Sequence, residues 1–162
     1  MTDSVVPKRK KLRLKDYDCN GNGCYFVIVG AGLRARPQAA IVLTPLGREV
    51  EKSIGYINTH YKDIDVENAI VMPNHIHLLI TIDNIEARYT GGHGDPPLQD
   101  IIRNFKSYTT KKYWEISSNK NDILWQRRYY DHIIRNQSDF EYHWNYIEYN
   151  ALKEYSQKED KI

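Results

Sequence analysis

The clearest structural signal in the sequence is His75-Ile-His-Leu-Leu-Ile-Thr-Ile82, which follows an expected turn at Pro73-Asn74. Its apolar and β-branched composition predicts a strand over residues 75–82. Alternate side chains of a strand point to opposite faces of the sheet. One face of this strand should therefore pack under helices through Ile76, Leu78, Ile80 and Ile82. The other face should carry His75, His77, Leu79 and Thr81, with the two histidines about 6.6 Å apart along the strand.

Two further strands and a helix are expected on the N-terminal side of residue 82. The aromatic and β-branched run Cys24–Val29, bounded by glycines, predicts a first strand. Thr44-Pro45 predicts a helix start, because a capping hydroxyl precedes a proline at the first helical position. The apolar stripe of this helix would be Leu46, Val50, Ile54, Ile57 and Tyr61. Residues 63–72 predict a second strand, which makes residues 75–82 the third.

The C-terminal half predicts a helix, a strand and a last helix. The first of these helices has an apolar stripe at Leu98, Ile101, Ile102, Phe105 and Thr109. Residues 123–134 alternate and are rich in aromatic residues, which predicts a fourth strand. Ser138 and Glu141 have the spacing of a capping box, and the last helix would bury Phe140, Trp144, Ile147 and Ala151. The order β-α-β-β-α-β-α predicts a ferredoxin-like α+β fold, with an antiparallel sheet covered by helices on one face and open on the other.

Length and composition predict one domain at residues 16–155, between a basic arm at 1–15 and a polar tail at 156–162. The 162 residues contain only two cysteines, too few for a disulfide framework, which fits a cytoplasmic location. No apolar run reaches the roughly 20 residues of a membrane span, so no membrane partner is expected. Glycine- and proline-rich loops at 30–38 and 91–97 are expected to be surface insertions.

The net charge of +2 hides an uneven charge distribution. Residues 1–15 contain six Lys or Arg against Asp3, and residues 103–128 contain seven against Glu115 and Asp122. A basic arm and a basic central stretch favour a polyanionic partner. The alternative is a solubilising tail and a solvated helix face.

His75 and His77 form a partial metal site, because two imidazoles on one face of a strand can share an ion. Two ordinary surface histidines are the alternative. The last helix could add Asn150 as an oxygen ligand, and Tyr146 lies one helical turn before it. Since the chain has 13 tyrosines, Tyr146 could instead serve only in packing.

These motifs resemble a known family, the single-tyrosine HUH transposases, in their REP-associated branch. Met72-Pro-Asn-His-Ile-His77 matches the histidine–hydrophobic–histidine signature, and Tyr146-Ile-Glu-Tyr-Asn150 is similar to the nucleophile motif. Three other segments resemble this branch in the family's order, namely Arg13–Asp18, Gly23–Val27 and Trp125–Asn136. The family usually has proline after the amide ligand. Ala151 stands there in this chain, so the last helix is expected to continue.

The resemblance implies a divalent ion, Mg²⁺ or Mn²⁺, held by His75, His77 and Asn150. It also implies single-stranded or hairpin DNA as substrate, with palindromic repeats as targets, and either a monomer or a homodimer. Tyr146 would attack a phosphate to give a 5′-phosphotyrosine and a free 3′-hydroxyl, a step that another 3′-hydroxyl can reverse. Tyr108, in the basic helix, is the alternative nucleophile, but Lys112 occupies the position four residues after it.

The predicted DNA contacts combine basic and aromatic side chains. The second long helix would contribute Arg103, Lys106, Lys111 and Lys112, and the arm would grip phosphates through residues such as Arg13. One face of the fourth strand would contribute Trp125, Arg127 and Tyr129. Trp125 and Tyr129 could equally be core residues.

Two other functions share these features. A domesticated transposase could bind hairpin DNA without cutting it. A metal-dependent nuclease could use water as its nucleophile, and it would form no protein–DNA adduct.

Overall fold

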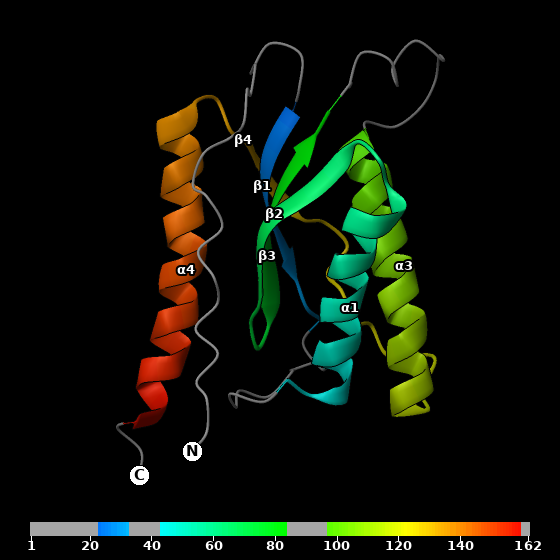
Figure 1. Ribbon diagram of the computed structural model, residues 1–162. Helices are drawn as coiled ribbons and strands as arrows, with labels where there is room; N and C mark the ends of the chain where they lie inside the picture. The colour runs from blue at the N-terminus through cyan, green and yellow to red at the C-terminus, as the bar shows by residue number, and fades with distance from the viewer. Residues whose placement is uncertain (1–22, 33–42, 84–96, 160–162) are drawn as a thin grey trace.

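A four-stranded antiparallel sheet with helices on both faces forms the fold (Figure 1). The computed structural model describes residues 23–32, 43–83 and 97–159, so the predicted arm at 1–15 and most of both irregular loops lie outside it. The elements are β1 (Gly23–Gly30), α1 (Pro45–His60), β2 (Ile64–Val71), β3 (His75–Ile82), α3 (Pro97–Ser117), β4 (Tyr130–Ile133) and α4 (Gln137–Glu159). The strand order β2-β3-β1-β4, with antiparallel neighbours throughout, confirms the predicted ferredoxin-like class.

The main core lies between the sheet and the pair α1 and α3. Ile76, Leu78, Ile80 and Ile82 of β3 are buried there, as their alternation predicted. The predicted stripes of both helices are buried too, apart from Tyr61, which is partly buried at the C-terminal end of α1. Thr44 caps α1 as predicted, since its hydroxyl accepts a hydrogen bond from the Gly47 amide at 3.0 Å. Among the described helices, none combines the length and apolar character needed to cross a bilayer.

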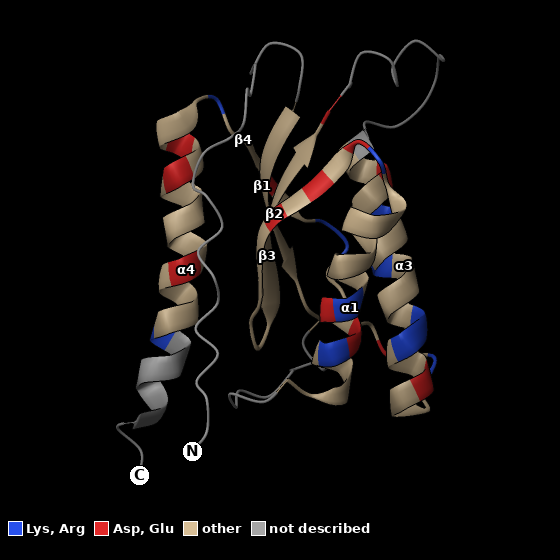
Figure 2. Cartoon of the chain, viewed as in Figure 1, with Lys and Arg blue, Asp and Glu red and all other residues tan. Residues whose placement is uncertain are grey.

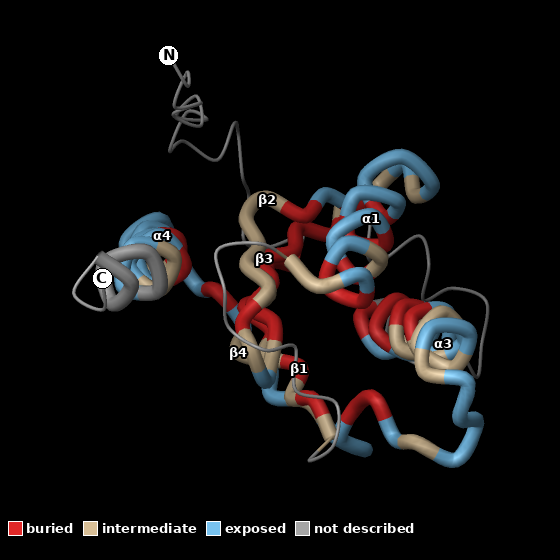
Figure 3. The backbone as a smooth tube through the Cα atoms, turned by 90° about the horizontal axis from the view of Figure 1, so that it is seen from below, coloured by how far each residue is buried: buried red, intermediate tan, exposed pale blue. Residues whose placement is uncertain are grey.

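The second face of the sheet is covered by α4, so the prediction of an open face was wrong. Figures 1 and 3 show α4 on one side of the sheet, with α1 and α3 on the other. A second cluster of buried apolar residues fills this layer. It joins Cys24, Phe26 and Leu79 of the sheet to Ile134 and to Phe140, Trp144 and Ile147 of α4. The apolar residues of the strands' second face provide the physical reason, because they would otherwise face water.

Helix α4 is capped two residues earlier than predicted. Asn136, not Ser138, is the capping residue, because its side-chain oxygen accepts from the Asp139 amide at 2.9 Å. Its carbonyl also accepts from the Phe140 amide at 3.0 Å. Glu141 accepts from Gln137 at 2.9 Å and takes no part in a capping box. The helix continues through Ala151 to Glu159, as the absence of proline at 151 predicted.

Strand β4 is shorter than predicted, and the strand prediction was wrong over residues 123–129. In that segment an isolated bridge pairs Trp125 with Ala31. The ammonium group of Lys106 lies 3.0, 3.4 and 3.4 Å from the carbonyl oxygens of residues 126, 127 and 128. Because an ammonium has three donors, Lys106 can satisfy three carbonyls that would otherwise need a neighbouring strand. Trp125, Arg127 and Tyr129 therefore do not share one strand face.

Replacing Lys106 by methionine should destabilise the protein by roughly 1–3 kcal/mol, because three backbone carbonyls lose a charged donor. Chemical denaturation measures the change in the free energy of unfolding. Lys111→Met is the matched control, since Lys111 is an exposed lysine on the same helix. Equal losses in the two variants would contradict the role given to Lys106.

Candidate functional site

The two histidines of β3 lie side by side on the face covered by α4. Their ring centroids are 4.6 Å apart, with the ring planes inclined at 45°. β3 is an interior strand, and its register places His77 opposite Ile28 of β1 and Ile70 of β2. Hydrogen bonds on both sides of the strand therefore fix the backbone that carries the pair.

His77 is a buried imidazole with no hydrogen-bond partner among the described residues. Its side chain is 2% exposed, and neither ring nitrogen is satisfied. Burial and, second, the neighbouring His75 lower the pKa of His77 from 6.5 to about 4. The ring is thus neutral at pH 7 and keeps a lone pair for a ligand. A buried polar group without a partner costs about 1–3 kcal/mol, which a bound cation would offset. His77 therefore fits a metal site.

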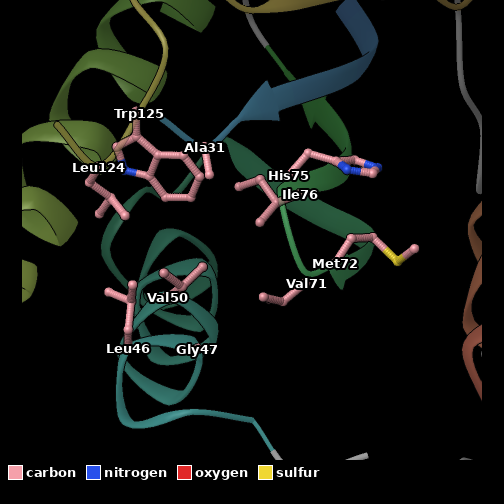
Figure 4. A pocket seen from close by; sticks show the side chains of 10 residues that line it. All are labelled: Ala31, Leu46, Gly47, Val50, Val71, Met72, His75, Ile76, Leu124 and Trp125. Carbon is pink, nitrogen blue, oxygen red and sulfur yellow. The ribbon is translucent and has the colours of Figure 1, made fainter. Parts of the chain in front are cut away.

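His75 is oriented by the residue before it. Its Nδ1 lies 2.5 Å from the side-chain oxygen of Asn74, and an amide oxygen can only accept, so Nδ1 carries the proton. The lone pair is then on Nε2, the arrangement found when a second residue orients a histidine ligand. An apolar pocket lies beside this strand, and Figure 4 shows Ile76 turned toward it and the His75 ring turned away. The two neighbouring residues thus serve opposite faces.

Tyr146 lies next to His77, although it comes from α4. Its ring centroid is 5.4 Å from that of His77 and 5.9 Å from that of Phe26. The residue is 40% exposed, so one side of the phenol packs on the sheet while the rest faces solvent. The hydroxyl of Tyr146 is therefore accessible to a large ligand, and it lies beside the imidazole of His77, a side chain that can bind a metal ion.

Asn150 lies one turn beyond Tyr146 on the same helix. Its amide nitrogen donates to the Tyr146 carbonyl at 2.8 Å, so the side-chain oxygen is the atom able to ligate an ion. Between these two residues, Glu148 accepts a hydrogen bond from Asn68 of β2 at 3.1 Å. Asn68 follows a bulge in β2, where the register shifts between Val66 and Asn68. This hydrogen bond joins α4 to β2 next to the bulge.

Tyr108 does not share this location. It is 51% exposed on α3, which covers the opposite face of the sheet, and the Lys112 ammonium lies 5.9 Å from its ring centroid. The structure thus brings Tyr146, and not Tyr108, next to the histidine pair.

The predicted DNA-contact residues fall into three groups. Trp125 is 8% exposed in the main core and donates to the Thr109 hydroxyl at 2.8 Å, so its indole is not available for stacking on a base. The Lys106 ammonium lies 5.4 Å from the ring centroid of the partly buried Tyr129. Arg13 lies outside the described residues. The remaining predicted contacts are on the surface, and these are Arg103, Lys111, Lys112 and Arg127.

Two of the surface cations have acidic partners. Arg103 pairs with Asp100, and Lys112 pairs with Glu115 at 2.9 Å, a hydrogen bond that raises the pKa of Lys112. Figure 2 shows basic residues along α3, whereas α4 carries mainly acidic ones. The basic surface is therefore on the opposite layer from the histidine pair.

Sequence reasoning missed a second group of metal-ligand side chains. His132, Asp139 and His143 offer ligand atoms that all lie within 4.8 Å of one another. The only local signal was the spacing of Asp139 and His143, which places both on one face of a helix. His132 joins them because β4 ends beside the first turn of α4.

His77 should make the free energy of unfolding depend on pH. Its pKa is about 4 in the folded protein and near 6.5 in the unfolded chain, so the unfolded state binds the proton first as the pH falls. Its contribution is full above pH 6.5 and declines between pH 6.5 and 4. By pH 4.5 the loss should reach roughly 2–3 kcal/mol. Urea unfolding of the wild type and of His77→Phe at pH 7 and 4.5 measures the difference.

The exposed His60 provides the control for this measurement. His60→Phe should retain the wild-type pH dependence, whereas His77→Phe should lose this component. The assignment fails if the wild type and His77→Phe lose the same free energy between the two pH values.

Comparison with known proteins places these features in context. No family model matches the chain. An uncharacterized protein of Haemophilus influenzae is 26% identical over 168 residues, covering 91% of this chain and 90% of that protein. A putative REP-associated tyrosine transposase of the same organism is 28% identical over 87 residues, covering 51% of this chain and 47% of the transposase.

One solved structure supports the fold. It is a REP-associated tyrosine transposase bound to a REP hairpin, with a TM-score of 0.56 and 24% identity, covering 81% of this chain and 67% of that one. The resemblance drawn from the histidine and tyrosine motifs is thus confirmed: the chain is similar in sequence to a curated putative REP-associated tyrosine transposase, and similar in fold to a solved one.

Proposed function

We propose that this chain is a REP-associated type of tyrosine transposase that cuts and rejoins single-stranded or hairpin DNA. The observation that carries the proposal is the meeting of two elements distant in sequence. The ring of Tyr146 on α4 lies 5.4 Å from that of His77 on β3. A nucleophile beside a metal-ligand pair is what phosphoryl transfer by a tyrosine requires.

His75, His77 and Asn150 would hold the divalent ion, Mg²⁺ or Mn²⁺. Supporting this assignment are the unsatisfied nitrogens of His77 and the Asn74 hydrogen bond that leaves the lone pair of His75 on Nε2. When bound, the ion would polarise a phosphate and offset the charge that grows on its oxygens.

Tyr146 would perform the strand cleavage. Its hydroxyl oxygen attacks the phosphorus atom, so a tyrosine–phosphorus bond forms as the bond to the 3′-oxygen breaks. The phenol loses its proton, and the departing 3′-oxygen takes one up to become a hydroxyl. The reverse attack by another 3′-hydroxyl rejoins DNA and restores Tyr146, without ATP.

DNA would be gripped through α3 and the segment that follows it. Lys111 and Arg127 are exposed and have no ion-pair partner within the part of the chain that the structure describes. Since these cations and Tyr146 lie on opposite layers, the bound strand would pass the β4 edge of the sheet. Arg13 and the basic arm would add phosphate contacts.

Tyr146→Phe should abolish covalent attachment to DNA, because only the hydroxyl is removed. The assay incubates full-length protein with Mn²⁺ and a labelled hairpin that carries single-stranded flanks, and it detects the adduct on a denaturing gel. Tyr149→Phe and Tyr108→Phe are the matched controls, both at exposed tyrosines, and should form the wild-type amount of adduct.

Three results would overturn the proposal. An adduct that survives in Tyr146→Phe removes the assigned nucleophile. Cleavage by the wild type without any adduct indicates a nuclease that uses water. Tight hairpin binding without cleavage by the wild type indicates a domesticated binding protein.

The double variant Lys111→Gln/Arg127→Gln should weaken DNA binding and its dependence on salt. Each lost phosphate contact lowers the slope of log K against log salt by about 0.7 for single strands, so the expected change is about 1.4. Lys52→Gln on α1, where Lys52 pairs with Glu49, is the control and should leave the slope unchanged. A wild-type slope in the double variant would exclude this surface from the binding path.

A further inference from the structure

We propose that His132, Asp139 and His143 form a second metal site, which takes a transition-metal ion such as Zn²⁺ and fastens α4 to β4. This inference goes beyond the proposed DNA chemistry and does not depend on it. The three residues lie outside the His75–His77 pair and have no part in the steps assigned to Tyr146.

The first argument is the convergence of the side chains on one carboxylate. The Nε2 of His132 lies 3.0 Å from one oxygen of Asp139, and the Nδ1 of His143 lies 3.2 Å from the other. The two imidazole rings stack, with centroids 4.8 Å apart and planes 25° from parallel. Two ring nitrogens from different elements are thus directed at a single acidic group.

The backbone explains why these residues meet. β4 pairs with β1 in a register that sets His132 opposite Phe26. The Asn136 cap then turns the chain so that Asp139 stands in the first turn of α4, with His143 one turn further on. Phe26 packs on His143 with ring centroids 4.5 Å apart, which supports the imidazole from the sheet side.

The Asp139 carboxylate has a further partner on the backbone. The Arg135 amide donates at 3.1 Å and would orient the carboxylate as an outer partner of a ligand.

The donor set selects the class of ion. Two imidazole nitrogens and one carboxylate oxygen are a ligand set that zinc uses with a water in the fourth position. Mg²⁺ prefers oxygen ligands and keeps several waters, so it fits this set poorly. In a tetrahedral site with ligand atoms about 2.0–2.2 Å from the ion, these atoms lie about 3.3–3.6 Å from one another, so the widest separation of 4.8 Å must close by about 1.2–1.5 Å on binding.

Binding the ion requires a change of tautomer at each imidazole, and this change releases no proton. The His143 Nδ1 also lies 2.9 Å from the Asp139 carbonyl oxygen, which can only accept, so this ring nitrogen carries the proton. On binding, each neutral imidazole would carry its proton on the other ring nitrogen. His132, Asp139 and His143 have side chains that are 33%, 21% and 12% exposed, so an ion can enter from solvent.

The test measures metal binding and stability, without DNA. Tag-free full-length protein is stripped with a chelator, and Zn²⁺ alone is added to the His75→Gln/His77→Gln variant, which lacks the other candidate site. Calorimetry should show one bound ion. Zinc at 100 times its Kd should raise the ratio of folded to unfolded protein about 100-fold.

The matched variant adds His132→Gln and His143→Gln to the same background and should lose both effects. Asp139→Asn keeps an acceptor for the Arg135 amide and should weaken zinc binding without unfolding the chain, as circular dichroism without metal would show. The proposal is overturned if zinc neither binds nor stabilises the His75→Gln/His77→Gln protein. It is equally overturned if zinc binding persists after His132 and His143 are replaced.

Discussion

The packing of α4 on the second face of the sheet is the constraint on which the candidate site depends. Phe26 and Leu79 present an apolar surface there, and Trp144 and Ile147 of α4 cover it. His77 shares this face, two residues before Leu79, so the packing that buries the apolar residues also removes His77 from water. The favourable free energy of burying the apolar residues of this layer offsets the unfavourable free energy of burying one imidazole. Proximity of Tyr146 to His77 follows from the same contact.

Local sequence patterns correctly predicted most of the secondary structure. The alternation of β3 and the Thr44-Pro45 start of α1 were readable because each depends on neighbours within a few residues. The strand prediction for residues 123–129 was wrong because the conformation of this segment depends on residues that are distant in sequence. The aromatic side chains of Trp125 and Tyr129 pack toward the main core without forming a strand face. Lys106, about 20 residues earlier in the sequence, donates to backbone carbonyls of this segment that would have paired with a neighbouring strand. That partner could not be inferred from periodicity.

The candidate site could likewise be predicted only in part from the sequence. The spacing of His75 and His77, and that of Tyr146 and Asn150, placed each pair on its own element from the sequence alone. Their meeting could not be read from composition or periodicity. It was expected from the resemblance to the HUH transposases, although the sheet face that α4 covers was expected to be open. The deep burial of His77 was also out of reach, since it depends on Phe26 and α4 together. The group of His132, Asp139 and His143 was not predicted, because His132 lies on β4 and the other two residues lie on α4.

Two polar contacts join α4 to the sheet at different points along the helix. One is at its first turn, around Asp139, and the other is the bond between Glu148 and Asn68. Tyr146 lies between these two polar contacts, whereas Asn150 lies beyond the second of them. Any tilt of the C-terminal end therefore displaces the amide before the phenol, at a lever arm that lengthens by about 1.5 Å per residue. Loosening of this end of the helix would displace Asn150, the proposed ligand, before Tyr146, the proposed nucleophile.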